Sequence, residues 1–205
     1  MITITLEASD AVSIASLINL TDPKTPGLDS VFVTSSTTDT VALATDRYVL
    51  GRYKAEEPTT TASEPIEWKL TAKACKFITA NVKPLNKWHT PTPLTVEINP
   101  ENNSFTINTG QTTFSDTWTK GLHNGTGQNL TKLVDEWRPA ELALPNYLTL
   151  KFLVKLSKLV NGFTKIDKFV FEIGANEYNA KKPGPMRASA NGGWEVLIQP
   201  NLMNN

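Results

Sequence analysis

Two lysine-bearing segments are the part of this chain whose residue types and spacing most directly suggest a chemistry. Within residues 72–83 and 149–161 every charged side chain is a lysine, and no acid occurs over 68–96 or 142–166. Like charges on a helix repel, so a lysine-only face suggests an anionic partner such as the phosphates of DNA. The predicted DNA-facing residues are Lys73, Lys76, Lys83, Lys151, Lys155 and Lys158.

A solvated helix face that happens to lack acids is the alternative interpretation of these lysines. It is the better explanation of either segment taken alone. The same pattern at the equivalent place in two repeated units favours DNA instead.

The rest of the sequence offers little for catalysis. His89 and His123 are the only histidines and lie in polar, loop-like surroundings, and residues 125–127 lack the strand that precedes a phosphate-binding loop. Cys75 is the single cysteine, which rules out an intrachain disulfide and a thiolate metal cluster. We therefore expect a protein that is not an enzyme, with no catalytic residue, metal or cofactor.

Asp46 is a carboxylate with two candidate roles, one catalytic and one structural. It lies in a polar turn between two apolar runs, and Arg47 follows it directly. A catalytic acid beside a cation is one possibility. A carboxylate that accepts hydrogen bonds from turn N–H groups is the preferred role, because Asp commonly does this in turns.

Hydrophobic periodicity places these residues in a repeated pattern of strands and helices. Helices are predicted from an N-cap at Ser9-Asp10 to Leu20, and over 72–83 and 149–161. Strands are predicted at 2–7, 30–35, 41–45, 48–54, 68–71, 95–98, 104–108, 112–118, 168–173, 186–190 and 194–198. The order β-α-β-β-β recurs, which predicts an α+β fold of antiparallel sheets with helices on one face.

The repeats divide the chain into two parts. Residues 1–120 contain two complete units and are predicted to form one domain. Residues 121–141 begin with a glycine-rich stretch and are predicted to be a linker. Residues 142–205 contain a third unit, which amounts to half a domain.

Bulk composition restricts how the chain can meet DNA or a membrane. The 20 Lys and Arg balance the 20 Asp and Glu, so net charge creates no general attraction to nucleic acid or anionic lipid. No apolar run approaches the roughly 20 residues of a membrane span, and the N-terminus lacks the features of a signal peptide. We expect a cytoplasmic protein with no membrane partner.

Two segments resemble motifs of the bacterial sliding clamp, the beta subunit of DNA polymerase III. The middle domain of that family carries a pattern close to Ala-Thr-Asp-Gly-His-Arg-Leu-Ala, and residues 44–51 here read Ala-Thr-Asp-Arg-Tyr-Val-Leu-Gly. The family ends near Val-Met-Pro-Met-Arg-Leu, and residues 196–203 read Val-Leu-Ile-Gln-Pro-Asn-Leu-Met. The family's first domain and the front half of its third have no counterpart, as in a shortened, phage-type clamp.

The resemblance implies a function on DNA. Clamps close into rings whose helices line the hole, and they bind partners in a pocket for short peptide motifs. Expected partners are double-stranded DNA, held loosely and without sequence preference, and DNA polymerase and a clamp loader. Thr45, Leu50 and Pro200 match pocket positions, and Tyr48, Val49 and Ile198 are expected beside them.

Ring geometry implies self-association, and two other functions remain open. A ring of this family contains twelve β-α-β-β-β units, so four copies of a three-unit chain would complete one. The first alternative is a clamp-fold module that binds replication proteins without encircling DNA. The second is an unrelated α+β binding protein.

Overall fold

The computed structural model describes residues 1–56, 58–82, 92–119, 126–140, 150–176 and 184–199. The helices are α1 (Ala8–Ser16), α2 (Ala72–Asn81), α3 (Thr126–Asp135) and α4 (Leu150–Leu156), and the 3-10 helix η1 (Leu17–Leu20) follows α1. The strands are β1 (Ile2–Leu6), β2 (Val31–Ser35), β3 (Asp39–Thr45), β4 (Val49–Glu56), β5 (Thr59–Thr60), β6 (Ile66–Leu70), β7 (Leu94–Asn99), β8 (Ser104–Asn108), β9 (Thr113–Thr117), β10 (Val160–Asn161), β11 (Thr164–Lys165), β12 (Val170–Ile173), β13 (Met186–Ala190) and β14 (Trp194–Ile198).

The first two repeats exchange strands. One sheet has the order β5-β1-β7-β8-β9 and the other the order β12-β13-β14-β4-β3-β2-β6, with all neighbours antiparallel. Strand β1 opens the first unit but pairs with β7 of the second, and β6 opens the second unit but pairs with β2 of the first. The two units therefore cannot separate without breaking both sheets.

The third repeat extends the seven-stranded sheet. Strand β14 pairs with β4 over five residue pairs, from Trp194–Tyr53 to Ile198–Val49. The predicted half domain is thus joined to the first domain by a continuous ladder of backbone hydrogen bonds. Its opening strand, expected near residues 142–148, lies outside the described residues.

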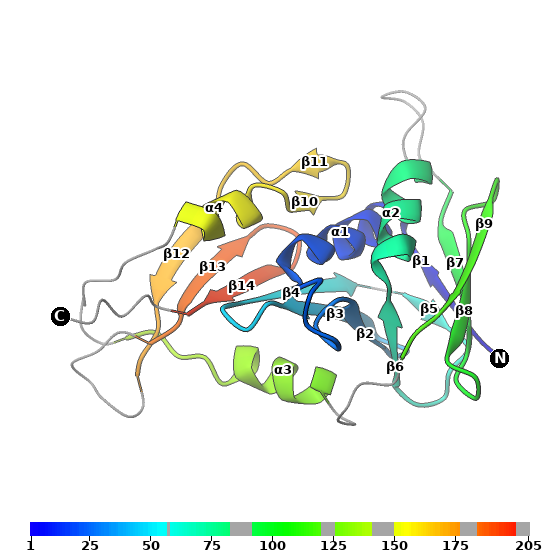
Figure 1. Ribbon diagram of the computed structural model, residues 1–205, viewed down its shortest axis with the longest axis horizontal. Coiled ribbons are helices and arrows are strands. Elements are labelled where there is room, and N and C mark those ends of the chain that lie inside the picture. Colours follow the sequence, from blue (N-terminus) through cyan, green and yellow to red (C-terminus); the bar gives the residue numbers. More distant parts are fainter. Residues whose placement is uncertain (57, 83–91, 120–125, 141–149, 177–183, 200–205) are drawn as a thin grey trace.

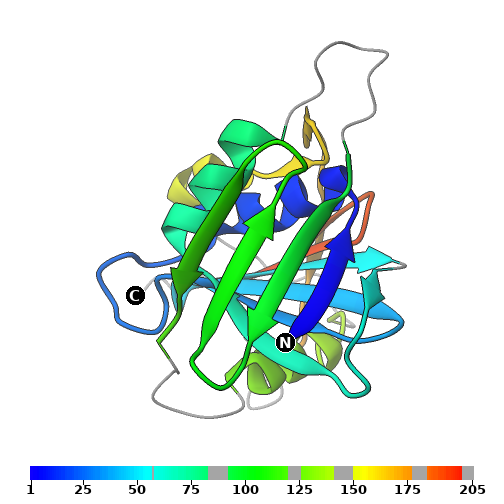
Figure 2. The ribbon, with the colours of Figure 1, turned by 90° about the vertical axis from the view of Figure 1, so that its right-hand side faces the viewer.

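Three helices lie on one side of the seven-stranded sheet and one on the other. Helices α1, α2 and α4 cover the side that we call the inner face, and α3 crosses the opposite, outer face (Figures 1 and 2). The predicted α+β class, with antiparallel sheets and helices on one face, is confirmed. Helix α3 is an addition, and it occupies residues that we predicted to be linker.

Small residues let α1 pack at the centre of the molecule. Seven of its nine residues are buried, among them Ser13 and Ser16. The hydroxyl of Ser13 donates to the carbonyl of Ser9 at 3.0 Å and accepts the N–H of Gly162 at 2.7 Å. A hydroxyl bonded on both sides can be buried without leaving an unsatisfied polar group. This contact brings the β10–β11 hairpin down onto α1.

Some predicted boundaries were wrong. Helix α1 is capped at Glu7, so Ser9 and Asp10 lie inside its first turn. Helix α4 ends at Leu156 instead of residue 161, because the chain turns and forms the β10–β11 hairpin, with Gly162 at a φ of 60°. The apolar pattern of residues 149–161 also predicts a core position for Leu153, which is 39% exposed because Phe152 and Leu156 define the buried face. The predicted loop 55–65 contains the short strand β5.

Candidate functional site

Helix α2 presents two of the predicted DNA-facing lysines. The Thr71 hydroxyl accepts the N–H of Ala74 at 3.2 Å and so caps the helix. Ala74, Cys75 and Ile78 are buried against the core, which turns Lys73 and Lys76 towards solvent. Lys83 lies outside the described residues.

Helix α4 and the turn after it present two more, and a third lysine of this segment is paired. Phe152 and Leu156 are buried, and Lys151 and Lys158 are exposed. The ammonium of Lys155 donates to Oδ2 of Asp46 at 2.7 Å. The prediction for Lys155 therefore needs correction, because its charge is already neutralised within the chain. Lys73, Lys76, Lys151 and Lys158 make no ion pair with any described residue.

Asp46 orders the turn between β3 and β4. Its Oδ1 accepts the N–H of Tyr48 at 2.9 Å and that of Val49 at 2.8 Å, so the predicted turn-carboxylate role is confirmed. Arg47 has a φ of 79°, a left-handed conformation that glycine adopts most readily. It occupies the position at which the clamp pattern has glycine.

Hydrogen bonding decides the protonation of Asp46. Burial opposes ionisation, but the hydrogen bonds from Lys155, Val49 and Tyr48 outweigh it and hold the pKa of Asp46 below its ordinary value. The carboxylate is therefore charged at neutral pH. It ties the turn of the first domain to α4 of the third repeat.

Replacing Asp46 with Asn should weaken this tie while keeping the turn, since an amide oxygen can still accept the two N–H groups. We expect the free energy of unfolding at pH 7 to fall by about 1.5–3 kcal/mol, the range for a hydrogen bond to a charged group. The folded-state pKa is depressed, so the wild-type advantage should vanish as pH falls below about 4 and through that pKa. Urea unfolding of Asp46→Asn, Lys155→Met and the double variant measures the coupling. Additive effects would contradict the ion pair.

The predicted peptide pocket is not one surface. Val49 and Ile198 point into the main core on the inner side and are 1% exposed. Tyr48 is exposed in the turn, where the Lys151 ammonium lies 5.1 Å from its ring centroid. Thr45 is buried and accepts the N–H of Arg47 through its hydroxyl. Pro200 lies outside the described residues.

Leu50 does lie on the outer face, beside a residue that we did not predict. Leu197 is its direct partner in the β14–β4 ladder, so both side chains emerge on the same side of the sheet. Ile198, which we chose, is one residue further along and points the opposite way. The two-residue period of β14 was the signal that could have identified Leu197.

Helix α3 covers this part of the outer face. Phe32, Leu43, Leu50 and Leu197 form what we call the outer apolar face. Val134 and Trp137 are buried against it, and Leu130 is partly buried. These contacts form a small hydrophobic cluster that is separate from the main core.

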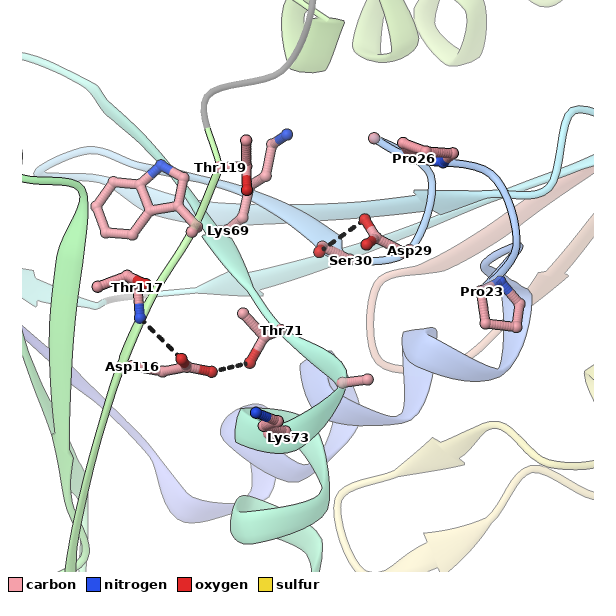
Figure 3. A pocket seen from close by; sticks show the side chains of 13 residues that line it. Pro23, Pro26, Asp29, Ser30, Lys69, Thr71, Lys73, Asp116, Thr117 and Thr119 are labelled. Atoms are coloured by element: carbon pink, nitrogen blue, oxygen red, sulfur yellow. Dashed lines mark hydrogen bonds between the residues drawn. The ribbon is translucent and has the colours of Figure 1, made fainter.

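A polar cavity of about 590 Å³ opens where α2 begins (Figure 3). Asp116 accepts the Thr71 hydroxyl at 2.7 Å on one side, and the loop that contains Pro23 and Pro26 lies across from it. Lys69 and Lys73 contribute two ammonium groups, and burial lowers the pKa of Lys69. Two carboxylates in the lining balance these charges, so the cavity has no net preference for an anion.

The described residues offer no thiolate nucleophile or clustered metal ligands. Burial raises the pKa of the Cys75 thiol to about 12, so it stays protonated at neutral pH. Groups of three or more potential His, Cys, Asp or Glu ligands do not occur in the described part of the chain. The helices described are also too short or too polar to cross a bilayer. His89 and His123 lie outside the described residues.

The backbone matches solved sliding clamps along nearly its whole length. The Helicobacter pylori beta clamp bound to a DNA ligase peptide superposes with a TM-score of 0.66 at 12% identity, covering 98% of this chain and 65% of that one. The Thermotoga maritima DNA polymerase III beta subunit gives 0.59 at 10% identity, covering 98% and 64%. A. fulgidus PCNA, in a structure with the C-terminal region of FEN-1, gives 0.62 at 8% identity and full coverage of both chains.

These similarities establish the fold. No protein-family model matches the sequence, and no curated protein matches it either. The chain spans 64–66% of the length of the bacterial clamps named above and their relatives. The chain therefore has the sliding-clamp fold.

Proposed function

We propose that this protein is a shortened, non-enzymatic sliding clamp, which closes into a homo-oligomeric ring around duplex DNA and tethers DNA polymerase and other replication proteins. The observation that carries the proposal is the inner face. There α2 and α4, from different repeats, lie on the same side of the sheet, and they present lysines that have no carboxylate partner in the described part of the chain.

The charge distribution suits loose contact with DNA. Net charge is zero, so attraction comes only from local lysines such as Lys73, Lys76, Lys151 and Lys158. A few phosphate contacts bind weakly and without sequence preference. Topology, instead of affinity, would then hold the ring on the duplex, which leaves it free to slide. We place this activity in the cytoplasm.

The two ends of the molecule supply surfaces for ring closure. Strand β12 ends the seven-stranded sheet beside α4, and β9 ends the other sheet at the far end (Figure 1). Near β12, Leu150 is 75% exposed and Val170 65% exposed. Ala140 donates to the Ile173 carbonyl at one end of β12, and the rest of that strand edge, with its exposed apolar side chains, has features of an interface.

Charge favours joining unlike ends. Residues 92–119, which contain β7, β8 and β9, carry three acids and no lysine or arginine. The segment 150–176 at the other end carries five lysines and two acids. Head-to-tail contact therefore brings opposite charges together, and repetition of such a contact closes a ring when the rotation permits.

The mass in solution tests ring closure. Light scattering after size exclusion, over a wide range of concentration, should give a closed oligomer that persists on dilution. Four copies of the 22.5 kDa chain would give about 90 kDa. Another closed size would remove the tetramer but keep the ring. A monomer at every concentration would contradict a self-sufficient clamp.

Partner binding is proposed by comparison. The H. pylori clamp holds a DNA ligase peptide, and the archaeal structure pairs PCNA with a segment of FEN-1. Polymerase and clamp loader peptides would dock here on the outer apolar face next to the Thr45–Tyr48 turn. A second candidate function is a clamp-fold module that binds such proteins without encircling DNA, and the zero net charge of the chain favours it.

A further inference from the structure

The outer apolar face is occupied by a segment of the chain itself. Leu130, Val134 and Trp137 of α3 and the turn after it are spaced i, i+4 and i+7, which places them on one side of a helix. They cover Leu50 and Leu197, two of the sheet residues that form the outer apolar face. The structure thus shows what kind of element this face binds.

The C-terminal end of α3 is firmly attached. The indole N–H of Trp137 donates to the carbonyl of Pro185 at 2.8 Å, and the Arg187 guanidinium lies 4.1 Å from the Trp137 ring centroid. Pro139 forms a β-bridge with Gly174. Asp135 pairs with Arg52 of β4. The Pro139 bridge would keep the segment tethered when the helix leaves the sheet, whereas the Asp135 and Trp137 contacts would break.

The helix body has fewer attachments. Val134 is buried and Leu130 partly buried, whereas Leu133 is 57% exposed. A helix of ten residues is marginal without its packing surface. The main core lies on the other side of the sheet, so undocking α3 would expose the small outer cluster and leave the main core intact.

We propose that the outer apolar face is a helix-binding site, on which α3 competes with an amphipathic helix of a partner protein. The partner helix would carry apolar residues at i, i+4 and i+7, and a carboxylate at i+5 to replace Asp135 at Arg52. Such a partner follows from the proposed clamp function, in which replication proteins dock on this face. The displacement of α3 by a partner helix does not follow from the clamp function and depends on the residues of this chain alone.

Competition makes a clear prediction for affinity. When α3 leaves the site free for only a small fraction of the time, the apparent affinity for a ligand equals the intrinsic affinity multiplied by that fraction. Val134→Asp puts a charge where α3 meets the sheet and should release the helix. Leu133→Asp makes a similar change on the exposed side of the same helix and is the matched control.

The test measures binding of a fluorescent peptide with the sequence of residues 126–140 to the full chain. The Val134→Asp chain should bind it at least roughly tenfold more tightly than wild type, and Leu133→Asp should bind like wild type. Equal affinities for Val134→Asp and wild type, or no binding to either, would overturn the competition.

Hydrogen exchange of the wild-type chain provides a measurement that needs no variant to fold. If α3 leaves the sheet by itself, its amides should exchange at least roughly tenfold faster than those of β3. Exchange of α3 only at the rate of β3 would show that the helix is a fixed part of the fold. Neither result depends on DNA or ring closure, so failure here is separate from failure of the clamp function.

Discussion

Reversing the charge of Lys76 and Lys158 together is expected to abolish retention of the protein on DNA. Lys76 is exposed on α2 and Lys158 is exposed in the turn after α4, and neither has an acidic partner among the described residues. Two glutamates would repel the phosphates that the lysines attract. Affinity for duplex at low salt should fall by more than roughly tenfold, and the slope of log affinity against log salt should become shallower by at least about two.

The matched control makes the same change in charge on the opposite side of the sheet. Lys132 in α3 and Arg138 after it are exposed, and α3 lies on the outer face. Lys132→Glu with Arg138→Glu should leave DNA binding unchanged, because those side chains would lie outside the ring. Filter binding at several salt concentrations distinguishes the pairs. Equal losses would show that DNA responds only to total charge.

Lys155 should be left out of this experiment. Its ammonium forms an ion pair with Asp46. Reversing the charge of Lys155 would destabilise the contact between the turn and α4, so a loss of stability could not be told from a loss of DNA binding. The spacing of the six lysines in the sequence predicts a single DNA-facing group. Among the five lysines that the structure describes, Lys155 is paired and the other four make no ion pair with a described residue, which sets the choice of variants.

Local sequence patterns predicted the order of strands and helices well. Alternation of apolar residues in β1, β7 and β8, and the Thr71 cap before a helical pattern in α2, are signals contained within a few neighbouring residues. The Asp46 turn was predictable for the same reason. Each of these features depends on backbone geometry that nearby side chains determine.

The missed features depend on residues far apart in the sequence. The pair of Lys155 and Asp46 joins positions 109 residues apart, and a list of charges cannot show it. Helix α3 has a largely polar sequence and gains its stability from Leu43, Leu50 and other residues of distant strands. Choosing Ile198 instead of Leu197 came from ignoring which face of β14 each residue occupies.

The junction between the third repeat and the first depends on Trp194. It is 1% exposed, stands opposite Tyr53 in the β14–β4 ladder, and its ring centroid lies 5.0 Å from that of Tyr53. The Tyr53 hydroxyl donates to Asp10 of α1 at 2.7 Å. Tyr53 therefore links the Trp194 indole of the last unit to helix α1 of the first.

Trp194→Ala is expected to lower the free energy of unfolding by about 3–5 kcal/mol, the range for truncating a large buried aromatic residue. Trp194→Phe should cost less than about 1.5 kcal/mol, because the buried indole N–H has no hydrogen-bond partner among the described residues and its loss removes no bond to them. Guanidinium unfolding compares the two. Similar losses of unfolding free energy for the two variants would mean that the indole N–H has a hydrogen-bond partner, such as a bound water. That hydrogen bond, more than packing, would then join the two parts of the chain.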